Sequence, residues 1–325
     1  MRKVFFFSFF VLFLLVQTRN ILAQSTTYPA EVDDRIKKVE NGLITSGRTQ
    51  NKERGSLKER MAFYNVQGLS IAVINNYRIE WAKGYGWADT SEKRPVTAQT
   101  LFQAASVSKS LNGIGVLKLV QDKKLDLNTD INEYLKSWKF PYDLVSKNKK
   151  ITIANLLSHT AGLNVHGFPG YTGDDTLPSI TDILEGKKPS NTKAIRSQFE
   201  PGLKFQYSGG GILISQLIIM DITNQPYDLY MQQNVLKPLG MTNSFYTQPP
   251  PEDKTQLLAT AYHSNGRNVN AKYHIYPEQA AAGLWTTPID LCNYIIETQL
   301  SYQNKSSKVL TYEMTKLRLT PYLDN

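Results

Sequence analysis

Residues 101–113 read LFQAASVSKSLNG and place a lysine inside a stretch of small and apolar residues. Apolar positions within and beyond this stretch recur at helical spacing: Leu111, Ile114, Leu117 and Val120. This spacing predicts a helix of about sixteen residues that begins near Ser106. A charged side chain at the start of such a helix has two interpretations. Lys109 either activates a nucleophilic serine or is a solvated surface charge.

The spacing of Ser106 and Lys109 favours the first interpretation. Residues three apart share one helix face with Cβ atoms about 5–6 Å apart, so the amine can reach the hydroxyl. Burial would lower the pKa of this amine, and free N–H groups at the helix N-terminus can stabilise an oxyanion. The alternative is that Ser106 only caps the helix. Two further Ser-x-x-Lys matches lie in polar, loop-like segments: Ser146/Lys149 and Ser190/Lys193.

The first 23 residues differ from the rest of the chain. Arg2 and Lys3 precede a Phe/Leu/Val run of about thirteen residues, which is short for a membrane span and typical of a signal peptide. Ile21 and Ala23 can serve as the cleavage positions, leaving Gln24 as the mature start. An uncleaved anchor is the alternative. We expect export, and therefore a periplasmic or secreted protein.

The net charge and the spacing of the cysteine and histidine residues argue against nucleic-acid binding and against a metal site. The formal net charge is +9 for 325 residues, and loss of residues 1–23 would lower it to +6. These charges are scattered and form no basic stripe with aromatics, so we expect no nucleic-acid partner. They are compatible with association with an anionic cell envelope. Cys292 is the only cysteine, so an intrachain disulfide is excluded. The four histidines lack ligand spacing, and we expect neither metal nor cofactor.

Secondary-structure patterns outline the fold. Residues 24–60 predict one helix, and residues 68–89 predict a β-hairpin that turns at Asn75-Asn76. Residues 280–285, AAAGLW, suggest a strand. Further helices are expected within 151–163, with Thr152 as its cap and Gly162 as its end, over about 211–223, and before 237–241. Another should begin after the Thr287 cap, with Pro288 at its first position and Asp290 as the acid of a capping box. This order predicts an α/β domain: an antiparallel sheet flanked by helices, with an all-α insertion at about 120–260.

A second motif lies about a hundred residues downstream of the first. Residues 199–211 read FEPGLKFQYSGGG, an aromatic-Gln-Tyr-Ser-Gly turn that opens a helix. With both motifs the sequence resembles the serine β-lactamase and penicillin-binding-protein-like superfamily, especially its class C β-lactamase, D-alanyl-D-alanine carboxypeptidase and esterase branch. The resemblance spans roughly residues 60–300. Its other matching segments are ITIANLLSHTAGL (151–163), NVLKPLGMTNSFY (234–246) and AAAGLWTTPIDLCNY (280–294).

The resemblance implies three catalytic residues. Ser106 matches the acylated nucleophile, Lys109 its partner in proton transfer, and Tyr207 the tyrosine of the family's Tyr-x-Asn element. A phenol is a poor base unless a cation stabilises its anion, and Lys109 could supply that cation. We interpret His159 as structural. The implied function is an exported, cofactor-free serine hydrolase that acts on an ester, an amide or a small peptide, with D-Ala peptides and β-lactams among the candidates. The alternative is an impaired penicillin- or peptidoglycan-binding sensor. The oligomeric state is left open.

The chain departs from the family pattern at two places. Gly209 stands where the family usually has the asparagine of its tyrosine element, which argues against efficient β-lactam hydrolysis. No Lys-Thr-Gly or His-x-Gly follows Trp285. We therefore expect a C-terminally incomplete copy of the domain, lacking its last strands. Such a copy would expose a sheet edge and lose an oxyanion donor, and it would be impaired as it stands.

Overall fold

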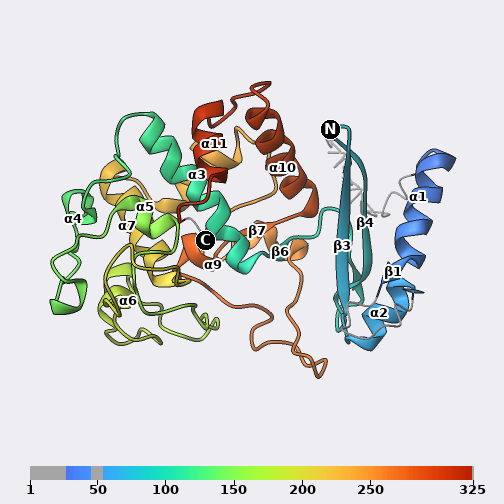
Figure 1. The fold of residues 1–325 in the computed structure, drawn as a ribbon. Helices are drawn as coiled ribbons and strands as arrows, with labels where there is room; N and C mark the ends of the chain where they lie inside the picture. Colours follow the sequence, from blue (N-terminus) through green and yellow to red (C-terminus); the bar gives the residue numbers. More distant parts are fainter. Residues whose placement is uncertain (1–26, 45–53, 324–325) are drawn as a thin grey trace, which may run out of the picture.

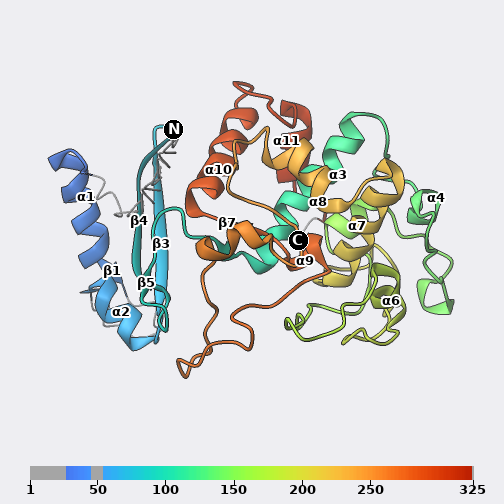
Figure 2. The same cartoon turned by 180° about the vertical axis from the view of Figure 1, so that it is seen from behind.

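A computed structural model describes residues 27–44 and 54–323 of the chain. Strands β3 (Gly68–Asn75), β4 (Arg78–Asp89) and β5 (Arg94–Pro95) form an antiparallel sheet in the order β3-β4-β5. Helix α1 (Ala30–Asn41) lies on one side of this sheet and a larger helical body on the other (Figures 1 and 2). Within that body α10 (Pro288–Tyr302) packs against β3 and β4. The antiparallel sheet flanked by helices agrees with the predicted fold class.

The β3–β4 hairpin has the predicted strands and a different turn. Asn75 pairs with Arg78, so the two turn residues are Asn76 and Tyr77 rather than Asn75 and Asn76. Both turn residues have positive φ, 52° and 59°, as a two-residue hairpin turn of the primed type requires. Because asparagine is common in such turns, the adjacent Asn75 and Asn76 suit a turn at 75–76 or at 76–77. The pairing of the two strands selects the turn at 76–77.

The N-terminal segment contains more structure than one helix. α2 (Leu57–Phe63) follows α1 and starts with a reciprocal capping box between Ser56 and Glu59. A short antiparallel pair, β1 (Leu43–Ile44) and β2 (Arg54–Gly55), accompanies these helices. The Tyr28 hydroxyl donates to the Ala82 carbonyl of β4 at 2.9 Å and helps to hold the segment on the sheet.

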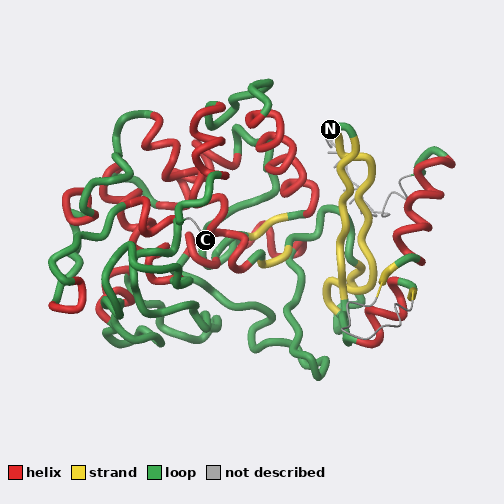
Figure 3. Tube along the Cα trace, viewed as in Figure 1, coloured by secondary structure: helices red, strands yellow, loops and turns green. Residues whose placement is uncertain are grey.

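Helices and long connecting loops make up the body between β6 (Phe102–Gln103) and β7 (Trp285–Thr286), and these two strands pair antiparallel. Residues 104–284 are all described, and within them only isolated bridges and no strand occur, as Figure 3 shows. α7 (Gly209–Thr223) is apolar on nearly all sides and buried through most of its length, as expected for a central helix. The other helices of this body are α3 (Ser108–Gln121), α4 (Ile131–Tyr134), α5 (Ile153–Leu157), α6 (Ile180–Glu185), α8 (Tyr227–Met231) and α9 (Gln279–Ala282).

The strand expected over residues 280–285 is mostly wrong. Gln279–Ala282 form the short helix α9, which ends at Gly283, and only Trp285 and Thr286 pair as strand β7. Alanine is the best helix former, and the run of three alanines follows that preference. The expected end of the 151–163 helix at Gly162 is also wrong, because α5 ends at Leu157. Its predicted Thr152 cap is confirmed, since this side chain accepts from the Asn155 N–H.

The C-terminal helices are α10 and α11 (Tyr312–Leu319). Thr287 caps α10 and Pro288 occupies its first turn, both as predicted. The Asp290 carboxylate accepts from the Asn243 N–H and the Ser244 hydroxyl instead of closing a capping box. No helix in the described part of the chain is long and apolar enough to cross a membrane. The predicted signal peptide, residues 1–23, lies outside the described residues.

Glu278, which precedes α9, is a buried acid. Its side chain is 0% exposed, and neither carboxyl oxygen has a hydrogen-bond partner among the described residues. Burial raises the pKa of Glu278 to about 7, because an apolar environment disfavours the charged form. The carboxyl group therefore makes folding stability depend on pH.

We predict that Glu278→Gln flattens this pH dependence. Well below pH 4.5, the ordinary pKa of a glutamate, the acid is protonated in both states and has no effect on stability. As pH rises toward 7 the unfolded chain releases the proton and the folded chain retains it, so the wild type loses stability. The loss should be about 3 kcal/mol relative to the variant. Denaturant unfolding of both proteins at pH 4.5 and 7.5 measures it, and parallel curves would contradict the assignment.

Candidate active site

Ser106 lies on an exposed turn rather than inside the helix that follows it. Ala105–Val107 form one 3₁₀ turn between β6 and α3, and the α-helix starts only at Ser108, two residues later than predicted. Ala105 has a φ of +43°, a strained value for a residue with a side chain. This turn exposes the Ser106 side chain, as a nucleophile requires.

Buried Ser108 ties the strained turn to the segment after α9. Its hydroxyl donates to the Ala105 carbonyl at 2.5 Å and accepts from the Leu284 N–H at 3.0 Å. The Ala104 N–H donates in turn to the Leu284 carbonyl at 2.9 Å. The structural role of Ser108 was not predicted from the sequence, because nothing in the sequence shows which groups a serine within a helix will contact. These bonds explain how the backbone around Ser106 keeps a costly conformation.

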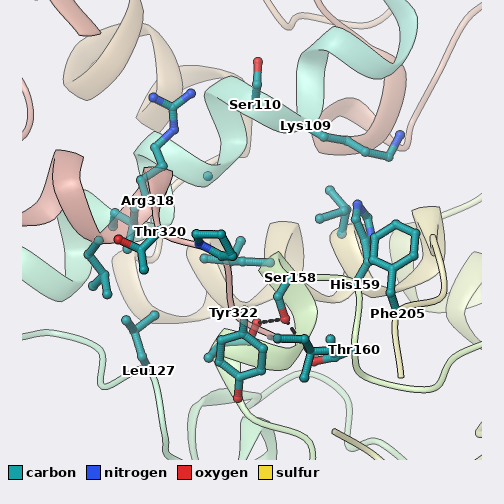
Figure 4. Close-up of a pocket in the computed structure, with 18 of the residues that line it drawn as sticks. Lys109, Ser110, Leu127, Ser158, His159, Thr160, Phe205, Arg318, Thr320 and Tyr322 are labelled. Atoms are coloured by element: carbon teal, nitrogen blue, oxygen red, sulfur yellow. Dashed lines mark hydrogen bonds between the residues drawn. The ribbon is translucent and has the colours of Figure 1, made fainter. Parts of the chain in front are cut away.

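Lys109 brings the three predicted catalytic residues together. Its Nζ donates to Ser106 Oγ at 3.0 Å, on the neighbouring turn as predicted. The same atom lies 5.2 Å from the centre of the Tyr207 ring, a cation–π contact. A third contact was not foreseen: Nζ donates to the Ala281 carbonyl of α9 at 2.6 Å. The ammonium is therefore held from three directions. Figure 4 shows its side chain reaching toward His159 and Phe205.

His159 positions Tyr207. The two rings lie 4.5 Å apart at 36°, and His159 Nδ1 accepts from the Ser208 N–H at 3.2 Å. Burial, with a smaller contribution from the Lys109 charge, lowers the pKa of His159 to about 4. The imidazole is thus neutral at ordinary pH, and its Nδ1 is occupied by the backbone. This agrees with our interpretation of His159 as structural. His166 Nδ1 donates to the Tyr207 carbonyl at 2.6 Å and fixes the backbone.

Tyr207 remains accessible despite these contacts. It is 36% exposed at the N-terminus of α7, where Ser208 is the helix cap. A substrate can therefore reach the tyrosine from solvent. The catalytic roles of Ser106, Lys109 and Tyr207 stay a prediction, supported by their shared contacts.

The departure at Gly209 has a steric explanation. A Cβ atom at this position would lie 3.1 Å from both the His166 carbonyl and the Phe168 ring. Those neighbours would have to move before an asparagine could fit. The close approach of His166 and Phe168 therefore explains why a glycine, rather than the family's asparagine, fits at position 209.

Two glutamines hold the α9 segment that supports Lys109. On α7, buried Gln216 donates to the Pro277 carbonyl at 3.0 Å and accepts from the Ala280 N–H at 2.8 Å. Gln248 accepts from the Tyr276 N–H at 3.1 Å and donates to the Gly283 carbonyl at 2.8 Å. Each amide thus makes two bonds to the backbone around α9. Together they fix the Ala281 carbonyl in front of Lys109.

Metal-binding side chains do not gather at this site. Over residues 27–44 and 54–323, no three His, Cys, Asp or Glu side chains lie close enough together to hold a metal ion. The side chains that do gather here are the hydroxyl of Ser106, the amine of Lys109 and the phenol of Tyr207.

We predict that Gln216→Leu destabilises the fold by about 1–3 kcal/mol, because it leaves the buried Ala280 N–H without a partner, while the Pro277 carbonyl keeps only its bond from the Gln279 N–H. Urea unfolding measures the loss. Gln233→Leu, at an exposed position after α8, is the matched control and should change stability by less than about 0.5 kcal/mol. Equal effects of the two substitutions would show that Gln216 does not hold α9.

Comparison with known proteins gives the same family as the motifs. A family model described as Beta-lactamase matches residues 54–322. Protein flp of Staphylococcus aureus is 31% identical over 228 residues, which are 69% of this chain and 42% of that protein. A beta-lactamase of Pseudomonas fluorescens is 29% identical over 231 residues, 71% of this chain and 59% of that protein. The chain thus spans less than half the length of the first relative.

A solved structure shows the same fold. The octameric penicillin-binding protein homologue from Pyrococcus abyssi superposes with a TM-score of 0.65 at 24% identity, covering 80% of this chain and 57% of that chain. The predicted fold class is therefore confirmed, and so is the resemblance drawn from the two motifs. Because the family match extends over most of the described residues, the chain belongs to the beta-lactamase family.

Proposed function

We propose that the chain is a serine hydrolase that forms an acyl-enzyme on Ser106 and acts on an ester, an amide or a small peptide. The observation that carries this proposal is the position of the Lys109 amine, 3.0 Å from Ser106 Oγ and 5.2 Å from the centre of the Tyr207 ring. Membership of the beta-lactamase family supports a function of the serine-hydrolase type. D-Ala peptides and β-lactams are candidate substrates within this class.

The proposed reaction uses these groups in two half-reactions. Ser106 Oγ attacks the substrate carbonyl carbon, and its proton passes to the Lys109–Tyr207 pair. The same pair protonates the leaving alcohol or amine as its bond to the carbonyl breaks. Water then attacks the ester on Ser106 and releases the acid. A backbone N–H of the 105–107 turn would stabilise the oxyanion in both halves.

Location is a separate part of the proposal. The apolar run after Arg2 and Lys3 supports export, which would place the enzyme in the periplasm or outside the cell. A hydrolase there would meet small molecules or peptides, and its basic charge would favour the anionic cell envelope.

A second candidate is a penicillin- or peptidoglycan-binding sensor that is acylated without turnover. Gly209 favours it, because the amide that usually contacts both lysine and substrate is missing at this position. The two candidates differ in deacylation. A hydrolase shows sustained product release, whereas a sensor shows one equivalent of product and then stops.

We predict steady turnover of p-nitrophenyl butyrate that falls about 1000-fold or more in Ser106→Ala. A chromogenic cephalosporin, followed in parallel, should be turned over far more slowly than the ester. The matched control is Ser146→Ala, which removes the serine of another Ser-x-x-Lys sequence, and it should keep wild-type rates. A stoichiometric burst without turnover would favour the sensor. Equal rates in Ser106→Ala and wild type would refute the nucleophile.

A further inference from the structure

A cavity of about 700 Å³ opens beside the proposed active site. α3 forms one wall, the segment from α5 to Thr160 the second, and residues 317–323 the third, as Figure 4 shows. A volume of this size is typical of sites that bind a small molecule. Neither proton transfer nor the positioning of Tyr207 requires such a cavity.

The cavity begins at Lys109, one turn along α3 from Ser106, and follows the helix away from the serine. Lys109, His159 and Phe205 belong to its lining. Gly113 and Leu117 continue the same face of α3, one and two turns beyond Lys109. With a rise of 1.5 Å per residue, the lining extends about 12 Å along the helix from Lys109 to Leu117. A substrate whose carbonyl lies at Ser106 could therefore extend its remainder along this face.

The walls favour an apolar occupant. More of the wall surface is apolar than polar, although Asn128, Arg318 and Tyr322 also line the cavity. Leucine and isoleucine side chains contribute to the apolar part: Leu117, Leu127, Leu157, Ile212 and Leu317. Three of the wall hydroxyls already donate to backbone carbonyls three or four residues earlier in the chain. Ser110 donates to the Val107 carbonyl at 2.8 Å, Ser158 to that of Ala154 at 2.7 Å and Thr320 to that of Lys316 at 2.8 Å. These three hydroxyls have no donor hydrogen left for a ligand, so along this part of the wall the gain on binding would come from apolar burial.

Gly113 makes room for this occupant. A Cβ atom built there would have no other atom within 4 Å. Glycine inside a helix costs roughly 0.5–1 kcal/mol relative to alanine, so its presence midway along α3 calls for a reason. The reason we infer is that a glycine at this position keeps the cavity beside α3 open.

We propose that this cavity binds the acyl chain of the substrate, so that the preferred substrates are esters or amides of medium-length aliphatic acids. The inference rests on the proposed hydrolase function and names its substrate class. Each methylene that enters the cavity should raise kcat/KM about fourfold, until the cavity is full.

The test compares p-nitrophenyl acetate, butyrate, hexanoate and octanoate with wild type, Gly113→Leu and Gly113→Phe. In the wild type kcat/KM should rise with chain length. Each variant fills the cavity, and we expect the octanoate-to-acetate ratio of kcat/KM to fall at least about tenfold. Lys38→Leu, which adds a leucine on α1 far from the cavity, should keep the wild-type ratio. Leu157→Phe narrows the cavity from the opposite wall and covers the case in which the Gly113 variants fail to fold.

A binding measurement separates this inference from the proposed function. Octanoate should raise the melting temperature of Ser106→Ala, and this effect should disappear when Gly113→Leu is added. Binding without any Ser106-dependent turnover would leave the cavity assignment standing and refute the hydrolase. Ser106-dependent turnover with a ratio that the Gly113 and Leu157 variants do not change would refute the acyl-chain site alone. Absence of octanoate binding would also count against the acyl-chain site.

Discussion

The ammonium of Lys109 donates to the Ala281 carbonyl at 2.6 Å and to Ser106 Oγ at 3.0 Å. These two bonds join segments that are far apart in sequence, the start of α3 and the short helix α9. The Tyr207 ring at the N-terminus of α7 approaches the same ammonium. A change in the position of any one of these helices would move the amine away from the serine. The architecture of the body therefore determines whether the amine lies within hydrogen-bond distance of Ser106.

Much of the surrounding structure maintains this arrangement. Gln216 and Gln248 hold the backbone around α9, and Ser108 ties the strained 105–107 turn to Leu284. His159 stays neutral and supports the Tyr207 ring. Each of these side chains bonds to backbone groups of the neighbouring segments, and buried groups such as the Leu284 and Ala280 N–H would be costly to leave unpaired. Fold stability and the geometry of the site thus depend on the same hydrogen bonds.

Features of the structure that depend on residues close together in the sequence could be predicted from the sequence. Helical spacing located α3, caps at Thr152 and Thr287 located two helix starts, and the i, i+3 rule placed Lys109 beside Ser106. The turn at Asn76-Tyr77 was missed because neighbouring asparagines suit two registers, and α9 was missed because a run of alanines precedes a strand residue. The Ala281 carbonyl and the two glutamines carry no local signal. Their roles arise only when residues 28 to 172 positions apart meet in the fold.

The most direct test of this account is the rate at which a fluorophosphonate labels the protein, measured by intact mass and peptide mapping. Activation by Lys109 predicts one adduct, on Ser106, and labelling about 100-fold slower or more in Lys109→Met. Circular dichroism and a melting curve establish that the variant is folded. An adduct on another residue, or equal labelling rates in wild type and folded Lys109→Met, would contradict the account.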